Sequence, residues 1–189
     1  REPDHFERLQ DAILPDLLEH IPSGVLDIWC AGCSTGEECY TLGMALQEYR
    51  RSRNDACRAR ILATDISGEA LEKAKKGVYP VKELEGLPSE WRRRYCGKTD
   101  GRTFGVEEDL KACVRFQRRN LMDPVRTSEK FHIILCRNVM IYFDKSSRER
   151  LISTLDKGGY LLIGHAELLT AKETRLEPVY PAVYRKKRE

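Results

Sequence analysis

One stretch of this chain, residues 25–51, constrains the fold more than any other, because it joins a strand, a glycine turn and a helix. Residues 25–30 form a short apolar run that predicts a buried strand. Residues 31–36 hold two glycines and predict a tight turn, and the apolar spacing in residues 37–51 predicts a helix. A strand followed directly by a helix is typical of parallel sheets, since parallel strands need a long crossover connection.

The same alternation recurs further along the chain. Residues 60–65 predict a second strand, and a helix begins after Ser67. Gly77 predicts the end of that helix, because glycine readily takes the left-handed conformation of a helix cap. The remaining predicted elements are a leading helix at 6–20, strands at 131–136 and 160–164, a helix at 146–155 and an edge strand at 182–185.

Residues 79–118 interrupt the alternation. Gly97, Gly101 and Gly105 separate short β-like runs there, which predicts a small inserted antiparallel element. A chain of 189 residues is long enough for one substantial core. We therefore expect residues 1–189 to form a single α/β domain, with a mostly parallel sheet, helices on both faces and this small insertion.

The composition narrows the class of protein. Charged residues make up 33% of the chain but the net charge is only +3, which argues against a nucleic-acid partner. There is no apolar run of the roughly 20 residues that a membrane helix needs, and no signal-peptide core. Seven cysteines without zinc-ribbon spacing predict free thiols, no metal and a cytoplasmic location. The alternative is that Cys30 and Cys33, which form a C-x-x-C spacing, have a redox or metal-binding role and are not simply part of the glycine turn.

The glycine turn carries the first indication of a ligand. It follows the first strand, and in parallel α/β sheets ligands bind at the carboxyl edge of the strands. A phosphate cradle would place Lys and Ser/Thr after the glycines, but Glu37 and Glu38 stand there instead. Two carboxylates repel a pyrophosphate and attract an ammonium or sulfonium cation. The alternative is that they only complement the dipole of the helix.

Asp65 carries the second indication. It ends the second predicted strand about 30 residues after the turn, where an acid accepts the ribose hydroxyls in nucleoside-binding α/β folds. The alternative is that Asp65 caps the following helix. Ser67 is available for that cap, which favours the ribose role.

Four motifs together resemble one family. AGCSTGEE at 31–38, ATDI at 63–66, CRNVMIYFD at 136–144 and GGYLLIGH at 158–165 are similar to the chemotaxis receptor (CheR) methyltransferases, in matching order. The resemblance implies a Rossmann-like class I methyltransferase fold and an enzyme of chemotaxis signal transduction. Its implied activity is transfer of a methyl group from S-adenosylmethionine to glutamate carboxylates of chemoreceptors, with S-adenosylhomocysteine as the product.

The resemblance also implies roles for single residues. Glu38, or less favourably Glu37, would lie near the amino end of the cofactor, and Asp65 would bind the ribose. Asn120 and Leu121 would lie beside the adenine, unless Asn120 only closes a turn. The cofactor-binding set is Arg1, Gly32, Glu37, Glu38, Asp65, Asn120, Leu121, Arg137 and Asn138, and the catalytic positioning set is Asn138, Tyr142 and Arg1. No general base is expected, since the glutamate acceptor is ionised at neutral pH.

Partners follow from the same resemblance. They are the cytoplasmic regions of membrane chemoreceptors, and we expect the protein to act as a monomer. Residues 79–118 occupy the place where family members can bind a receptor tail, by adding a strand to a sheet edge. The N-terminal helical domain usual in the family is not part of residues 1–189. The alternatives are a methyltransferase with another substrate, or a non-catalytic module that senses the cofactor.

Overall fold

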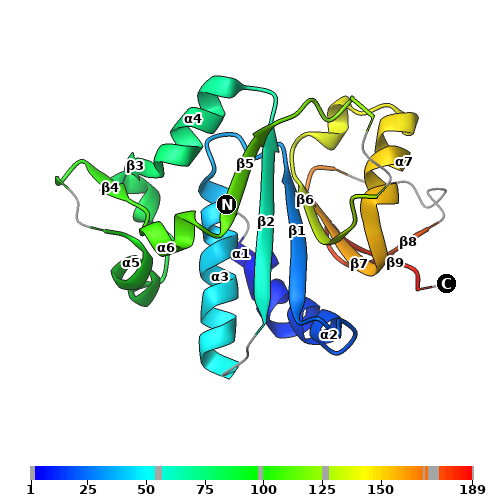
Figure 1. Ribbon diagram of the computed structural model, residues 1–189, viewed down its shortest axis with the longest axis horizontal. Helices are drawn as coiled ribbons and strands as arrows, with labels where there is room; N and C mark the ends of the chain where they lie inside the picture. Colours follow the sequence, from blue (N-terminus) through cyan, green and yellow to red (C-terminus); the bar gives the residue numbers. More distant parts are fainter. Residues whose placement is uncertain are drawn as a thin grey trace.

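A seven-stranded sheet forms the centre of the protein (Figure 1). The computed structural model describes residues 3–53, 57–97, 100–124, 128–167, 169 and 175–188, with side chains from residue 5 onward. The strand order is β5-β2-β1-β6-β7-β9-β8. The strands are β1 (Val25–Ala31), β2 (Arg58–Asp65), β5 (Val114–Arg118), β6 (Phe131–Cys136), β7 (Leu155–Ile163), β8 (Leu176–Tyr180) and β9 (Val183–Lys186).

Most strands of this sheet run in the same direction. β1 pairs in parallel with β2 and β6, β2 with β5, and β6 with β7. β9 runs antiparallel to both of its neighbours, β7 and β8. The predicted mostly parallel sheet is confirmed, and the carboxyl ends of β1, β2, β5, β6 and β7 therefore meet at one edge.

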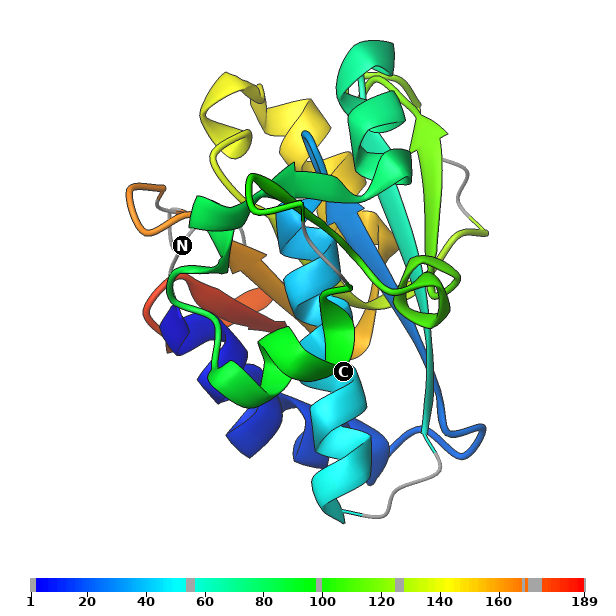
Figure 2. The same ribbon diagram turned by 90° about the vertical axis from the view of Figure 1, so that its left-hand side faces the viewer.

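Helices cover both faces of the sheet, as predicted. The period of two along β1 places Ile28 in one apolar layer and Trp29 in the other. The first layer includes residues of the leading helices, α3 and α4, and the second includes residues of α7 (Figures 1 and 2). The main helices are α1 (Pro3–Arg8), η1 (Leu9–Ile13), α2 (Leu14–Leu18), α3 (Glu37–Arg53), α4 (Gly68–Lys76) and α7 (Lys145–Thr154). Within the described residues, none of the helices is both long and apolar enough to cross a membrane.

The ends of α4 match the sequence prediction closely. The Ser67 hydroxyl accepts the backbone N–H of Ala70 at 3.2 Å and so caps the first turn. Gly77 has a φ of 60°, the left-handed conformation expected after the last turn. Both signals were local, and both are confirmed.

One strand that we placed in the insertion belongs to the main sheet. Val114–Arg118 forms β5, which pairs in parallel with β2 from Ile61 to Asp65. Its sequence, VRFQR, carries two arginines and does not look like a buried parallel strand. Because β5 lies at the edge of the sheet, only one of its sides is hydrogen-bonded, and charged side chains there remain in water.

The other end of the sheet also differs from the prediction. The predicted edge strand at 182–185 lies between β7 and β8, so the outermost strand is β8. β8 escaped prediction because Glu177 and Pro178 interrupt its apolar pattern, although proline is tolerated at a sheet edge. β7 starts at Leu155 and not at Tyr160, because its pairing with β6 shifts around Gly158, whose φ is 75°.

The insertion contains the predicted small antiparallel sheet. β3 (Val78–Pro80) pairs with β4 (Thr103–Gly105), and the short helices η2 (Val81–Leu84), α5 (Ser89–Tyr95) and α6 (Glu108–Lys111) accompany them. Glu48 of α3 binds α5 through hydrogen bonds. The Glu48 carboxylate accepts two hydrogen bonds from Arg94, both 2.7 Å, and one of 2.6 Å from the Tyr95 hydroxyl.

We expect Glu48→Gln to lower the free energy of unfolding by about 2 kcal/mol at neutral pH, because bonds to a charged acceptor are lost. Burial acts to raise the pKa of Glu48, but the hydrogen bonds from Tyr95 and Arg94 outweigh it and lower the pKa. A lowered pKa stabilises the fold above the unfolded value of about 4.3, and this contribution disappears as the pH falls through the folded value. Urea unfolding at several pH values measures both effects.

The matched control is Glu85→Gln, since Glu85 is exposed. The account of this contact fails if Glu48→Gln unfolds at the same urea concentration as the control at neutral pH. It also fails if the difference between the two variants grows in acid.

Candidate active site

The glycine turn after β1 is tied to the end of β2. The N–H groups of Gly32 and Cys33 both donate to the Thr64 carbonyl oxygen at 2.9 Å. Gly32 has a φ of 79°, and a Cβ atom there would lie 2.8 Å from Cγ2 of Val139. Glycine is therefore required both by the backbone conformation and by the loop after β6, which approaches closely.

Asp65 links the same turn to the start of α4. One carboxylate oxygen accepts the backbone N–H of Ser34 at 2.8 Å, and the other accepts that of Ser67 at 2.9 Å. Ser67, and not Asp65, caps α4. The Asp65 side chain is partly exposed, and each of its oxygens has a second lone pair for a further donor. Asp65 is thus available to hydroxyl groups of a ligand at this edge.

The two glutamates at the start of α3 have different environments. Glu37 is exposed and accepts the Thr35 hydroxyl at 2.8 and 2.7 Å. Glu38 forms an ion pair of 2.5 Å with Arg137, whose side chain is only 4% exposed. Arg137 compensates the charge of Glu38, and Glu37 and Asp65 add two further carboxylates near the turn. A glycine backbone and these carboxylates together fit a cofactor that carries a sulfonium and an ammonium group.

The loop after β6 presents Asn138 and Tyr142 near this turn. Asn138 has a φ of 60°, which asparagine tolerates better than most residues. η3 (Met140–Tyr142) follows, and its Met140 is buried. Tyr142 is 74% exposed and its neighbour Ile141 is 64% exposed. Such exposure leaves the Tyr142 ring accessible to a ligand or partner.

Asn120 and Leu121 follow β5 at the same edge. The backbone N–H of Arg119 donates to the Asp65 carbonyl oxygen at 3.0 Å, so this segment lies beside Asp65. The Asn120 amide oxygen accepts the N–H of Met122 at 3.0 Å, which closes a local turn. Leu121 packs against the second apolar layer. Arg1 lies outside the described residues, while His5 packs edge-on against His165, with ring centroids 4.9 Å apart.

Three buried cysteines near the turn, Cys30, Cys39 and Cys136, have raised pKa values. Hydrogen bonds with Cys30 and Cys33 and burial raise the pKa of Cys39. Burial, with the nearby Glu167 and Glu38 carboxylates, raises the pKa of Cys136. Protonated, buried thiols react and bind metals weakly. A hydrogen bond with Cys39 acts to lower the pKa of Cys30, but burial and the nearby Glu38 carboxylate raise it overall, which disfavours redox or metal chemistry at Cys30.

Two contacts of the site were missed from the sequence. The Tyr79 hydroxyl in β3 donates to the Thr35 carbonyl oxygen at 2.7 Å, which connects the insertion to the glycine turn. The Glu167 carboxylate accepts the backbone N–H of Asn138 at 2.9 Å. Both join residues far apart in sequence. The only local signal was the place of Glu167, two residues after the end of the GGYLLIGH motif.

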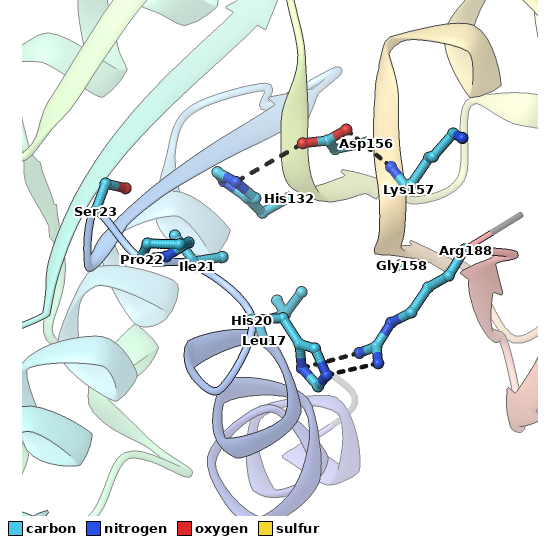
Figure 3. A pocket seen from close by; sticks show the side chains of 10 residues that line it. All are labelled: Leu17, His20, Ile21, Pro22, Ser23, His132, Asp156, Lys157, Gly158 and Arg188. Atoms are coloured by element: carbon cyan, nitrogen blue, oxygen red, sulfur yellow. Dashed lines mark hydrogen bonds and ion pairs between the residues drawn. The ribbon is translucent and has the colours of Figure 1, made fainter.

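A cavity of about 410 Å³ lies at the opposite, amino edge of β1, β6 and β7 (Figure 3). Its Arg188 contacts the ring of His20 at 2.8 Å and the Asp16 carboxylate at 3.1 Å. Its His132 accepts the backbone N–H of Asp27 at 2.9 Å. These groups are engaged with the protein itself, and the cavity is separated from the glycine turn by the length of the strands.

The sheet and the site together define the class of protein to which the chain belongs. A parallel sheet with a reversed β9 between β7 and β8, a glycine turn after the first strand and an acid after the second are the features of a Rossmann-like methyltransferase. Two solved structures share the fold. The DszA carbon methyltransferase has a TM-score of 0.53 at 19% identity, covering 85% of this chain and 35% of that one. The citrinin polyketide synthase CMeT domain has a TM-score of 0.52 at 18% identity, covering 84% and 34%.

Sequence comparison identifies the family. The model described as CheR methyltransferase, SAM binding domain, matches residues 1–184. The chemotaxis protein methyltransferase of Borreliella burgdorferi is 43% identical, over 98% of this chain and 68% of its own length. Chemotaxis protein methyltransferase Cher2 of Pseudomonas putida is 36% identical, over 87% and 62%. The chain belongs to the CheR methyltransferase family, and it spans about two thirds of the length of these relatives.

The resemblance read from the four motifs is thereby confirmed. The domain is that of an S-adenosylmethionine-dependent methyltransferase, and S-adenosylmethionine is its cofactor.

Proposed function

We propose that this domain methylates glutamate side chains in the cytoplasmic regions of membrane chemoreceptors, and that it acts as a monomer in the cytoplasm. The products are glutamate methyl esters, which adjust the receptors during sensory adaptation, and S-adenosylhomocysteine. The observation that carries the proposal is the Glu38–Arg137 ion pair. It joins a turn suited to a cationic cofactor with the loop that presents Asn138 and the exposed Tyr142. The names of the relatives, chemotaxis protein methyltransferases, support the choice of acceptor.

The cofactor would be held along the carboxyl edge of the sheet. Asp65 accepts the ribose hydroxyls, and Gly32 lets the backbone approach the methionine portion. Glu38, fixed by Arg137, lies toward the amino end, with Glu37 contributing charge from the exposed side. Asn120 and Leu121 lie beside the adenine. Arg1 is assigned to the methionine portion by the family pattern alone, since it lies outside the described residues.

The transfer reaction requires little acid–base catalysis from the protein. A glutamate acceptor with a pKa near 4.3 is ionised at neutral pH, so no residue needs to remove a proton. When bound, S-adenosylmethionine supplies a methyl group activated by its sulfonium. Asn138, Tyr142 and Arg1 hold the acceptor carboxylate in line with that methyl group and exclude water from it. Such alignment and desolvation are worth several kcal/mol of the barrier.

The insertion offers a place for receptor recognition. In the two-stranded β3–β4 sheet, Gly97 already donates to the Gly105 carbonyl oxygen on the outer side of β4, so an extended receptor tail would add as a further strand along β3. The hydrogen bond from Tyr79 to Thr35 places this sheet beside the glycine turn, so that a tail bound there is held near the site of transfer.

Labelled methyl transfer to a matched pair of receptor fragments tests the proposal. One fragment carries its methylation-site glutamates, and the other carries glutamine at the same positions. We expect label on the glutamate fragment and not on the glutamine fragment. Equal labelling of both would indicate a different acceptor. Cofactor binding without any transfer, in the presence of the family's N-terminal domain, would indicate a sensing module.

A further inference from the structure

Glu167 is a buried carboxylate at the carboxyl edge of the sheet, and the functions described so far leave it without a role. The residue is only 4% exposed to solvent. It lies just beyond the end of β7, beside the loop that follows β6. Burying a carboxylate is costly unless donors surround it, so its partners indicate what it is for.

These partners are backbone N–H groups on two segments. One carboxylate oxygen accepts the N–H of Gly164 at 2.8 Å and that of Asn138 at 2.9 Å. The other oxygen accepts the N–H of Ile141 at 3.3 Å. A single side chain thereby joins the end of β7 to two points of the loop that carries Asn138 and Tyr142.

The packing around this junction leaves little room for movement. A Cβ atom on Gly164 would lie 2.6 Å from the Asn138 side-chain oxygen and 3.1 Å from a Glu167 oxygen. Asn138 is held there in the left-handed conformation, with a φ of 60°. Because an unsupported loop readily leaves such a conformation, the hydrogen bond from its N–H to Glu167 is a direct restraint on the position of its side chain.

We propose that Glu167 is a positioning residue for methyl transfer, which holds Asn138 and Tyr142 at the distance and angle that the acceptor carboxylate requires. This inference rests on the function proposed above. Glu167 works through the backbone of the loop and does not contact the acceptor or the methyl group. A misplacement of the loop by about 1 Å is sufficient to slow a transfer reaction by roughly 100-fold.

Two substitutions of graded severity test the inference. Glu167→Gln keeps one acceptor oxygen for Asn138 and Gly164 but turns an amide N–H₂ toward the N–H of Ile141. We expect kcat to fall by roughly 10-fold in this variant and by roughly 100-fold in Glu167→Ala. In both, the Kd for S-adenosylhomocysteine stays within about threefold of the parent, because Gly32, Glu38 and Asp65, which carry most of the proposed cofactor contacts, are unaltered. Glu177→Gln, an exposed position in β8, is the matched control.

Amide hydrogen exchange provides a readout that does not depend on activity. We expect the Asn138 amide to exchange faster in Glu167→Ala, and the Ile141 amide in Glu167→Gln, while amides of β1 keep their protection. If Glu167→Ala does not fold, the kcat and Kd of Glu167→Gln alone test the inference. A Glu167→Gln protein with the kcat of the control, or one that loses cofactor affinity in proportion to kcat, overturns the inference. Absence of transfer by the parent domain counts instead against the proposed function.

Discussion

Asp65→Ala is expected to weaken S-adenosylmethionine binding by 100-fold or more. The variant removes the proposed acceptor of both ribose hydroxyls, and each hydrogen bond to a charged group contributes about 1.5–3 kcal/mol. It also removes the bonds by which Asp65 holds the N–H groups of Ser34 and Ser67. Isothermal titration of parent and variant with S-adenosylmethionine measures the loss, with thermal unfolding as the check that the variant is folded.

A cofactor analogue separates the two contributions of Asp65. The 2′,3′-dideoxy analogue of S-adenosylhomocysteine lacks the ribose hydroxyls and should bind the parent weakly. If Asp65 acts on the ribose, Asp65→Ala costs much less affinity for the analogue than for S-adenosylhomocysteine itself. The ribose assignment is wrong if Asp65→Ala binds S-adenosylmethionine as tightly as the parent.

The second large effect is expected from Tyr142→Phe, which should slow methyl transfer without changing cofactor binding. The ring is 74% exposed, so loss of the hydroxyl should leave the fold intact. Removal of one group that positions the reacting atoms typically lowers kcat by roughly 100-fold or more. We therefore expect kcat to fall by about that factor, while the Kd for S-adenosylhomocysteine stays the same. Steady-state transfer assays and titration measure the two quantities separately.

Ile141→Val is the control for Tyr142→Phe, because Ile141 is the exposed neighbour in the same turn. An unchanged kcat in Tyr142→Phe would mean that the hydroxyl has no part in transfer. A weakened cofactor affinity at unchanged kcat would instead indicate that Tyr142 contacts the cofactor and not the acceptor.

The central strands of the fold were predictable because their signals are local. The apolar runs of β1, β2, β6 and β7 each have both faces covered, and glycine and serine mark the ends of α4. β5 and β8 were not recognised as strands of the main sheet. Both lie at its edges, where arginine, glutamate and proline are tolerated and the apolar pattern is lost.

The site was predictable in part for a similar reason. Topology places every loop after a parallel strand at one edge, so Gly32 and Asp65 were expected to lie together there, and the family resemblance added Asn138. The Glu38–Arg137 pair joins side chains 99 residues apart, and the Glu167 carboxylate accepts the backbone N–H of Asn138, 29 residues away. No local pattern in the sequence indicates either contact. The different environments of the two glutamates likewise appear only in the structure, which leaves Glu37 exposed and pairs Glu38 with Arg137.

The chemical nature of the transferred label tests the central claim most directly. The domain, completed with the family's N-terminal domain, is incubated with methyl-labelled S-adenosylmethionine and a chemoreceptor cytoplasmic fragment, and the labelled fragment is then treated with mild alkali. A carboxyl methyl ester hydrolyses to volatile methanol, so the account predicts that the label leaves the fragment as methanol. Label that stays on the fragment through alkali would show methylation of nitrogen or another stable group and would contradict the account.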